Sequence, residues 1–530
     1  MAPSGVRIHR SSRLLRAVHL ELPPTLAPRT IAFAVAMLGA ASAVPTWAGN
    51  WTIVPSISLR ETLTDNVDLS PAGQAQSDLV SEVIPAISII GEGGRFRLNL
   101  NYSFDALLYA RTGSTNNENR SNLDAFGTLE AVENWFFIDA RGVISQQSIS
   151  AFGAPATSAA SATANRTQTS TYELSPYLRG RFGDLATYDL RYSAIYSTSQ
   201  TEVYGSSTTG TWSADLRGGR EYRSMEWALT ARQQDIDRDV LRDTKETRGQ
   251  GFLTYIFSPE FRVSASAGYE SNNFVTLDQD ANVIYGGGLD WTPSPRTRLS
   301  LFNEKRFFGS GWNYSLTHRM PRSFWSYTDR KDTTTNATSQ LGMGGGNALN
   351  LLSNILTTQI PDEGARTQEA QRLLEQGGIP ANVGVASSVA TPLIYVVRSQ
   401  DASVAMMGVR NTVTLSAFRY QQRQLFLGSQ DLGDFSGLTA YTEKGIGANW
   451  SLRVTPITSL SVTGRYSRTN GSAAAVLEND QYQMNALLTT SFGQRTSGSL
   501  GVRYAVFKTT TPGTTDYRET AVFGALTYRF

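Results

Sequence analysis

Apolar and polar residues alternate along this chain in long segments, and that alternation constrains the fold more than any other feature. In 95–109, the even-numbered residues are apolar or aromatic, and the odd-numbered ones as far as Asp105 are polar or charged. Segments 186–197 and 449–454 repeat the pattern. Successive side chains of a strand point to opposite faces. Segments of this length therefore predict membrane-spanning strands with a lipid face and a polar face toward a lumen.

Short and long connections separate these segments in turn. Short ones with Gly, Pro or charged residues fall at 91–95, 132–134, 182–184, 222–224, 258–260, 293–296, 321–323, 408–411, 455–459 and 492–495. Longer polar stretches fall between them, at 111–119, 148–168, 198–208, 272–281 and 470–478. Tight turns at one end and long loops at the other are typical of outer-membrane barrels. With strands added at 51–63 and 517–530, we predict an all-β fold: a transmembrane antiparallel barrel of about 22 strands (range about 18 to 22).

The start of the chain resembles a secretory signal. Residues 1–48 carry five arginines ahead of an apolar run at 31–44, which is too short to span a bilayer. We predict cleavage after Ala48, with Ala43 as the alternative site and a single membrane anchor as the alternative role of the segment. The barrel domain would then be 49–530. A secretory signal followed by a barrel domain predicts a location in the outer membrane of a Gram-negative bacterium, with membrane lipid and lipopolysaccharide as partners.

Charge and cysteine content exclude several functions. Removal of 1–48 takes five of the 47 basic and one of the 45 acidic residues, which leaves a formal charge of −2. Nucleic-acid binding therefore has no electrostatic support. The chain has no cysteine, so it forms neither disulfides nor thiolate metal sites.

One stretch, 332–391, interrupts the strand pattern. It opens on a polar and glycine-rich part and then shows two helical patterns, at 347–356 and 361–378. By strand order it lies on the extracellular side, where it either folds into the lumen or caps the mouth.

Candidate catalytic chemistry is sparse. His318 is the one histidine after residue 48, and a polar contact near the periplasmic rim is the role that we favour over general acid–base work. Three short segments with acidic residues, at 64–66, 278–280 and 478–480, could hold calcium. We prefer the interpretation that they are ordinary solvent-exposed loops. We predict no enzyme activity, no cofactor and no metal site.

Arginines on the predicted lumen faces are the candidate site residues: Arg95, Arg97, Arg191, Arg262, Arg298, Arg453, Arg465 and Arg503. Basic residues that line a pore favour anionic solutes. Asp105, Asp189 and Asp215 share the same faces, however, and a structural network of ion pairs is the interpretation that we prefer. Inward aromatics such as Tyr177 and Phe507 either line a sugar track or fill space.

The last strand carries a second candidate feature. Val522, Leu526, Tyr528 and the final Phe530 share one face. An aromatic end on an alternating strand is expected to be read by the barrel-insertion machinery, and the strand itself is expected to pair with the first one to close the sheet.

Three blocks resemble the PEP-CTERM system-associated outer-membrane proteins: WTIVPSISLRETLTDNVDLS (51–70), YSLTHRMPRSFWSYTDRKDTTT (314–335) and GVRNTVTLSAFR (408–419). The resemblance covers most of the chain after residue 48, including the place of the helical insertion. It implies a large barrel associated with exopolysaccharide and exosortase loci, and it transfers no functional residue. The expected function is a conduit or accessory for exopolysaccharide export or assembly, with the polymer or its export apparatus as partner. A general or anion-selective porin for small solutes is the alternative.

Overall fold

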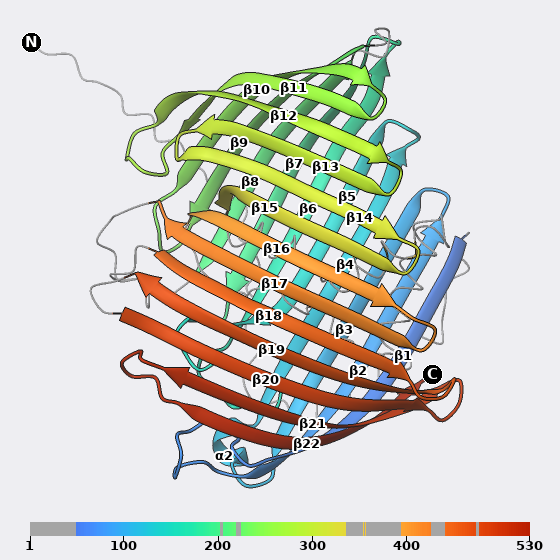
Figure 1. The fold of residues 1–530 in the computed structure, drawn as a ribbon, viewed down its shortest axis with the longest axis vertical. Coiled ribbons are helices and arrows are strands. Elements are labelled where there is room, and N and C mark those ends of the chain that lie inside the picture. Colours follow the sequence, from blue (N-terminus) through green and yellow to red (C-terminus); the bar gives the residue numbers. More distant parts are fainter. Residues whose placement is uncertain are drawn as a thin grey trace, which may run out of the picture. The chain divides into compact units, whose positions relative to one another are not determined.

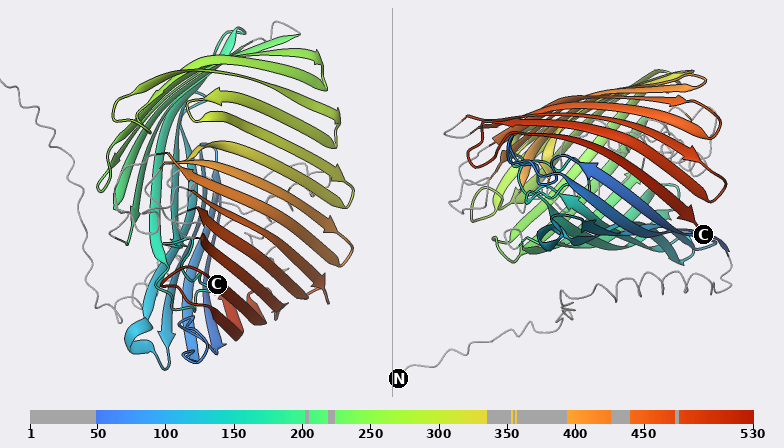
Figure 2. Two further views of the ribbon diagram at one scale, coloured as in Figure 1. Left: turned by 60° about the vertical axis from the view of Figure 1, so that its left-hand side comes forward. Right: turned by 90° about the horizontal axis from the view of Figure 1, so that it is seen from below.

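The described part of the chain forms one closed sheet of 22 antiparallel strands. This computed structural model describes residues 49–201, 205–218, 224–334, 394–425, 440–472 and 476–530, with Ser353 and Leu356. Each strand pairs with the next, and β1 (Gly49–Thr64) also pairs with β22 (Tyr517–Arg529), which closes the wall (Figures 1 and 2). The predicted all-β barrel of about 22 strands is confirmed.

The remaining strands follow in chain order. They are β2 (Asp78–Gly93), β3 (Phe96–Tyr109), β4 (Glu118–Val132), β5 (Phe136–Gln147), β6 (Thr167–Phe182), β7 (Ala186–Ser199), β8 (Ser206–Gly218), β9 (Met225–Arg238), β10 (Thr244–Ser258), β11 (Phe261–Asn272), β12 (Asp280–Ser294), β13 (Thr297–Arg306), β14 (Gly309–Met320), β15 (Ser323–Thr334), β16 (Tyr395–Met407), β17 (Asn411–Gln424), β18 (Ala440–Arg453), β19 (Thr458–Ser472), β20 (Val476–Ser491) and β21 (Thr496–Thr509). A short helix, α2 (Gly113–Asn116), lies between β3 and β4.

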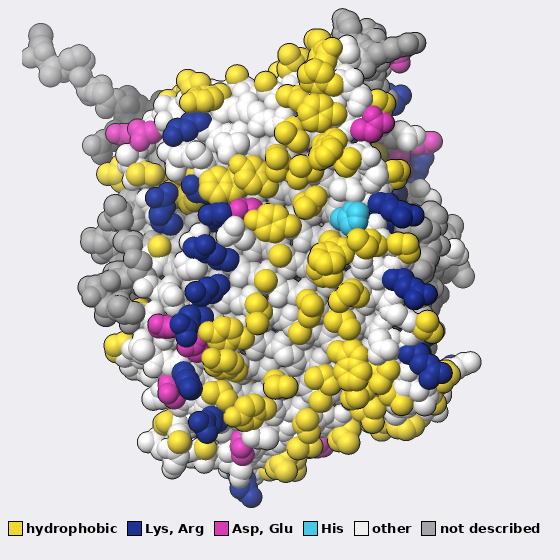
Figure 3. Space-filling model, in the orientation of Figure 1, with side chains coloured by type: hydrophobic (Ala, Val, Ile, Leu, Met, Phe, Trp, Pro, Cys, Tyr) yellow, Lys and Arg dark blue, Asp and Glu magenta, His cyan; other side chains and the backbone are white. Residues whose placement is uncertain are grey.

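Strand register places the apolar residues on the outside. On β7 the apolar residues from Ala186 to Tyr196 share the outer face, and Arg191 points into the lumen opposite Tyr177 of β6. Exposed side chains on the outer face include Leu174, Leu190, Tyr196, Trp212, Leu229, Ile446, Leu500 and Leu526. Figure 3 shows apolar side chains spread over much of one side of the barrel. An apolar surface of this extent is suited to lipid.

Nine of the ten predicted short turns lie at one end of the barrel, between strand pairs from β2–β3 to β20–β21, and residues 222–223 of the tenth lie outside the described residues. We call this the periplasmic end, after the arrangement of outer-membrane barrels. Gly183, in the β6–β7 turn, has a φ of +57°, a conformation that a side chain would strain. Arg95 lies in the β2–β3 turn, within the short connection predicted at 91–95, and not on the lumen face of a strand.

The opposite, extracellular end has the longer connections, with one departure from expectation. The predicted loop 470–478 is largely strand, because β19 extends to Ser472 and β20 begins at Val476. Only Phe307 and Phe308 join β13 to β14 at this end. Strand pairing extends the β19–β20 ladder through polar residues that the sequence pattern alone assigns to a loop.

The predicted insertion and leader fall mostly outside the described residues. Residues 332–334 belong to β15, and of the rest of the insertion Ser353 and Leu356 are described, both helical. The segment 1–48 is likewise outside. In the described ranges, no helix has the length and hydropathy needed to cross a bilayer.

Candidate functional site in the lumen

The loop between β5 and β6, residues 148–166, lies inside the extracellular end of the barrel, and we call it the inner loop. Phe152 is buried and packs edge-on against Tyr441 of β18, with ring centroids 6.4 Å apart. The side chain of Asn479 donates to the Ala151 carbonyl at 3.4 Å, and that of Gln483 donates to the Thr157 carbonyl at 3.2 Å. The inner loop therefore leaves one wall and is held by the inward residues of another.

Glu519 of β22 is the main anchor of the inner loop. Its carboxylate is buried and accepts hydrogen bonds from the Thr157 hydroxyl and, at 3.0 Å, from Thr64 of β1. Arg503 of β21 completes the site with an ion pair of 2.8 Å. The hydroxyl of Tyr517 donates to the Pro155 carbonyl at 2.9 Å. The barrel's closing strands thus hold the inner loop directly.

Two arginines hold the far side of the inner loop. Arg166 donates to the carbonyl of Ser158 at 2.7 Å and to that of Ala159 at 3.2 Å, and Arg120 of β4 also donates to the Ala159 carbonyl. Burial lowers the pKa of Arg166 to about 10, and the neighbouring Arg120 guanidinium contributes. Arg166 therefore stays charged at neutral pH and keeps donating to the carbonyls.

A hydrophobic cluster fixes the inner loop against the wall. Ala160 packs with Val67 of the β1–β2 loop and with Val80, Leu107 and Tyr109 of β2 and β3. Sequence reasoning placed 148–168 outside the barrel. The signal that was missed is its composition: 148–165 contain no charged residue and several alanines, which suits a buried segment better than an exposed loop.

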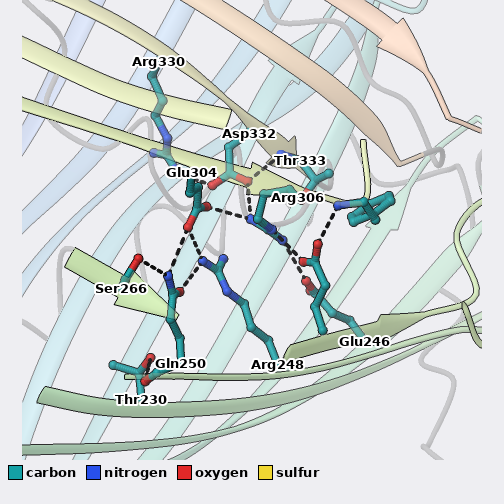
Figure 4. Close-up of polar contacts among 12 residues, drawn as sticks. Thr230, Glu246, Arg248, Gln250, Ser266, Glu304, Arg306, Arg330, Asp332 and Thr333 are labelled. Carbon is teal, nitrogen blue, oxygen red and sulfur yellow. Dashed lines mark hydrogen bonds and ion pairs between the residues drawn. The ribbon is translucent and has the colours of Figure 1, made fainter. Parts of the chain in front are cut away.

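A second part of the lumen wall is built around Arg306 of β13 (Figure 4). Its guanidinium is 1% exposed and lies 2.6 Å from Glu270, 3.2 Å from Asp332, 3.3 Å from Glu304 and 3.4 Å from Glu246. These carboxylates come from β10, β11, β13 and β15. The four carboxylates hold the buried guanidinium in place. Removing the guanidinium would leave buried carboxylates without a partner, which is strongly destabilising.

The network extends along the wall through Arg248 and Gln250 of β10. Arg248 pairs with Glu304 at 2.7 Å. The side-chain amide of Gln250 donates to Ser266 at 3.0 Å and to Glu304 at 3.3 Å. The result is a polar surface whose groups are largely satisfied by one another.

The predicted lumen arginines face the lumen, apart from Arg95 in its turn. Six of the eight pair with carboxylates: Arg95 with Glu133 (3.2 Å), Arg191 with Asp139 (2.8 Å), Arg262 with Glu226 (3.5 Å), Arg298 with Asp290 (3.6 Å), Arg465 with Glu443 (3.3 Å) and Arg503 with Glu519 (2.8 Å). Arg97 and Arg453 have no carboxylate at ion-pair distance in the described part of the chain. The structure does not gather the eight into one cluster.

Aromatic rings and guanidinium groups share the lumen wall toward the periplasmic end. Phe137 stacks on Tyr177 with centroids 5.1 Å apart, and the guanidinium of Arg191 lies 3.9 Å from the Tyr177 ring centre. Nearby on β3, Arg97, Asn99 and other inward residues are exposed to the lumen. This part of the wall is polar and accessible at Arg97 and Asn99, the ring of Phe137 is half-buried, and the ring of Tyr177 is buried beneath its neighbours.

His318 lies on the outer face of β14, near the periplasmic end. Its Nδ1 atom is 2.8 Å from the hydroxyl of Thr297 on β13, and the register places Trp325 of β15 beside it. No group of three or more potential metal-ligating side chains occurs among the residues described. The residues of the segment 478–480 are engaged elsewhere, since Arg468 contacts both acids.

The C-terminal residues complete the seam with β1. Val522, Leu526 and Tyr528 lie opposite Leu63, Leu59 and Ile57, so all three face outward. The backbone N–H of Phe530 donates to the Pro55 carbonyl at 2.9 Å, and the rings of Tyr528 and Phe530 meet edge-on at 5.0 Å. The aromatic pair therefore sits at the periplasmic border of the apolar surface.

No protein-family model and no curated protein matches the chain. The iron transporter FrpB from Neisseria meningitidis aligns with 90% of this chain and 81% of its own, at 10% identity and a TM-score of 0.49. The siderophore receptor PirA from Acinetobacter baumannii aligns with 92% and 81%, at 7% identity and 0.47. The outer membrane protein OprD from Pseudomonas aeruginosa aligns with 90% and 94%, at 9% identity and 0.33. These are similarities at low identity, and the fold described above rests on the strand pairing itself.

Proposed function

We propose that this protein is an outer-membrane barrel that serves as a conduit or accessory for the export or assembly of an exopolysaccharide. The observation that carries the proposal is the accessible lumen wall, where exposed amides and arginines such as Asn99 and Arg97 lie near the half-buried ring of Phe137. Sugars present hydroxyl groups and apolar ring faces. Amides can bond the hydroxyls and aromatic rings can pack on the faces.

The outer surface supports this location. A closed barrel is one of the two structures that satisfy every backbone group within lipid. Its outward residues are largely apolar, and aromatic side chains such as Trp325 and Tyr528 lie at the periplasmic border. Assembly by the barrel-insertion machinery belongs to the same proposal.

Paired charges favour a saccharide over a small anion. Most of the predicted lumen arginines contact a carboxylate within 3.6 Å. A wall with alternating signs gives a weak net field, so it neither attracts nor repels a charged polymer strongly. The inner loop narrows the extracellular end, through which an extended chain passes more readily than a folded protein.

An anion-selective or general porin is the second candidate. Arg97 and Arg453 favour it, because no carboxylate at ion-pair distance neutralises them within the described residues. An arginine exposed in a pore attracts small anions.

Two experiments separate the candidates. If the protein is a conduit, a strain without the gene should lose its surface polysaccharide or place it in the wrong compartment. Normal surface polysaccharide in that strain would exclude the conduit function. In planar bilayers, the conduit predicts that oligosaccharides from the same polymer interrupt the current. Steady conductance unaffected by them, with selectivity for anions, would instead establish the porin.

A further inference from the structure

A stripe of basic side chains crosses the outer face of the barrel near its extracellular end. We call it the outer basic stripe. It consists of Lys305, Lys331, Arg398, Arg419, Arg423, Lys444, Arg468, Lys508 and Arg518, which the strand register places on the outer face of β13 to β22. Figure 3 shows basic side chains in a column on the left-hand, extracellular side of the barrel.

The stripe borders the apolar surface. On β18, the outward residues after Lys444 toward the periplasm are Ile446, Ala448 and Trp450. On β21, Val506, Tyr504 and Val502 follow Lys508 in the same direction. The basic groups therefore lie just beyond the hydrocarbon region, at the level of the outer-leaflet headgroups.

Like charges face each other along the stripe. The register sets Lys331 opposite Arg398, Arg419 opposite Lys444, and Lys444 opposite Arg468. Like charges directly opposite on a sheet are destabilising. These facing pairs of basic residues recur on neighbouring strands. Their repetition therefore indicates that anions from outside the chain neutralise the positive charge of the stripe.

Three acidic side chains offset only part of this charge. Asp329 pairs with Arg398 at 2.7 Å, and Asp480 and Glu478 pair with Arg468 at 2.8 and 2.7 Å. In the described ranges, no carboxylate lies at ion-pair distance from the other seven basic residues. The indole ring of Trp312 lies 5.0 Å from Lys331 and from Arg398, which holds both cations at the membrane border.

Among the described residues, the other side of the barrel shows no such stripe. Outward strand positions near the same end of β2, β4, β5 and β7 carry neutral polar residues, including Ser81, Ser121, Gln146 and Thr198. Lys245 of β10 faces outward too, but Asp235 pairs with it at 3.3 Å. The charge excess is thus a local feature and not a general property of the extracellular border.

We propose that the outer basic stripe binds the phosphate groups of a phosphorylated glycolipid in the outer leaflet, the lipid A part of lipopolysaccharide. The stripe extends over ten strands, roughly 40 Å across at the usual strand spacing, which accommodates several headgroups side by side. Lys and Arg bind phosphate oxygens through charge-assisted hydrogen bonds. The inference rests on the proposed outer-membrane location and not on what passes through the lumen.

Native mass spectrometry of the purified barrel tests the assignment with bisphosphorylated lipid A, the same lipid without phosphates, and phosphatidylglycerol as probes. The stripe variant combines Lys331→Gln, Arg419→Gln and Lys444→Gln. A charge-conserving variant combines K331R, R419K and K444R. The matched control removes three exposed arginines from the periplasmic turns with R296Q, R322Q and R495Q.

The wild type, the charge-conserving variant and the turn control are expected to retain bisphosphorylated lipid A equally, and the stripe variant to retain at least fivefold less. Equal retention by the stripe variant, or equal retention of the phosphate-free lipid, overturns the phosphate site. Retention of phosphatidylglycerol as strong as that of lipid A overturns the choice of a glycolipid. Gel electrophoresis of each variant with and without boiling checks that it has folded, because a folded barrel migrates differently before it is boiled. Loss of lipid binding with unchanged lumen conductance leaves the proposed conduit standing.

Discussion

The hydroxyl of Thr157 donates a hydrogen bond to the carboxylate of Glu519, 362 positions further along the chain. The bond joins the inner loop to the strand that closes the barrel. Thr157→Val keeps the side-chain shape and leaves the ion pair between Glu519 and Arg503 intact. We expect the contacts that hold the loop to weaken by about 1 kcal/mol. The loop then fluctuates more about its remaining contacts, and the single-channel current becomes noisier.

The control for this substitution is Thr208→Val, at an exposed position on the outer face of β8. It changes the same chemical group without touching the inner loop. Currents that match the wild type in both variants would show that the loop does not limit the pore.

Arg306→Met tests the buried network. The substitution leaves four carboxylates around an apolar side chain, and breaking a buried ion pair destabilises by about 3–5 kcal/mol. The expected result is a lower temperature at which the folded band is lost on an unboiled gel. The same strand offers a control, Arg298→Met, whose side chain is 68% exposed. That change should alter the free energy of unfolding by no more than about 1 kcal/mol. Equal losses of stability in the two variants would contradict a special role for the buried network around Arg306.

Phe530→Ala tests the closing seam. Its ring contacts Tyr528 at the border of the apolar surface, where aromatic side chains anchor a barrel. We expect less protein to reach the membrane, as measured by the folded fraction in isolated outer membranes. The control is Phe492→Ala, a similarly exposed aromatic in the β20–β21 turn. If both variants assemble like the wild type, the terminal aromatic has no part in insertion.

Local sequence pattern was enough to predict the strands and turns, because each depends on neighbours along the chain. The alternation in 95–109 and 186–197 corresponds to β3 and β7, and the turns fall where Gly, Pro or charged residues interrupt it. The lumen faces of the arginines follow from the same period of two.

The inner loop and the networks could not be predicted in this way. The partners of Arg306 come from four strands and meet only when the wall curves and the register is set. No strand contributes more than two residues to the outer basic stripe, so a single strand shows nothing unusual. Lys331 and Arg398 become neighbours only through the pairing of β15 with β16.

Current through the purified barrel, recorded with and without oligosaccharides of the bacterium's own polymer, tests the central proposal most directly. A saccharide conduit would give a conducting pore whose current shows transient interruptions. The interruptions would become more frequent with oligosaccharide concentration and longer for longer chains. Absence of current in both the wild type and Thr157→Val, or a current that no oligosaccharide alters, would contradict a saccharide conduit.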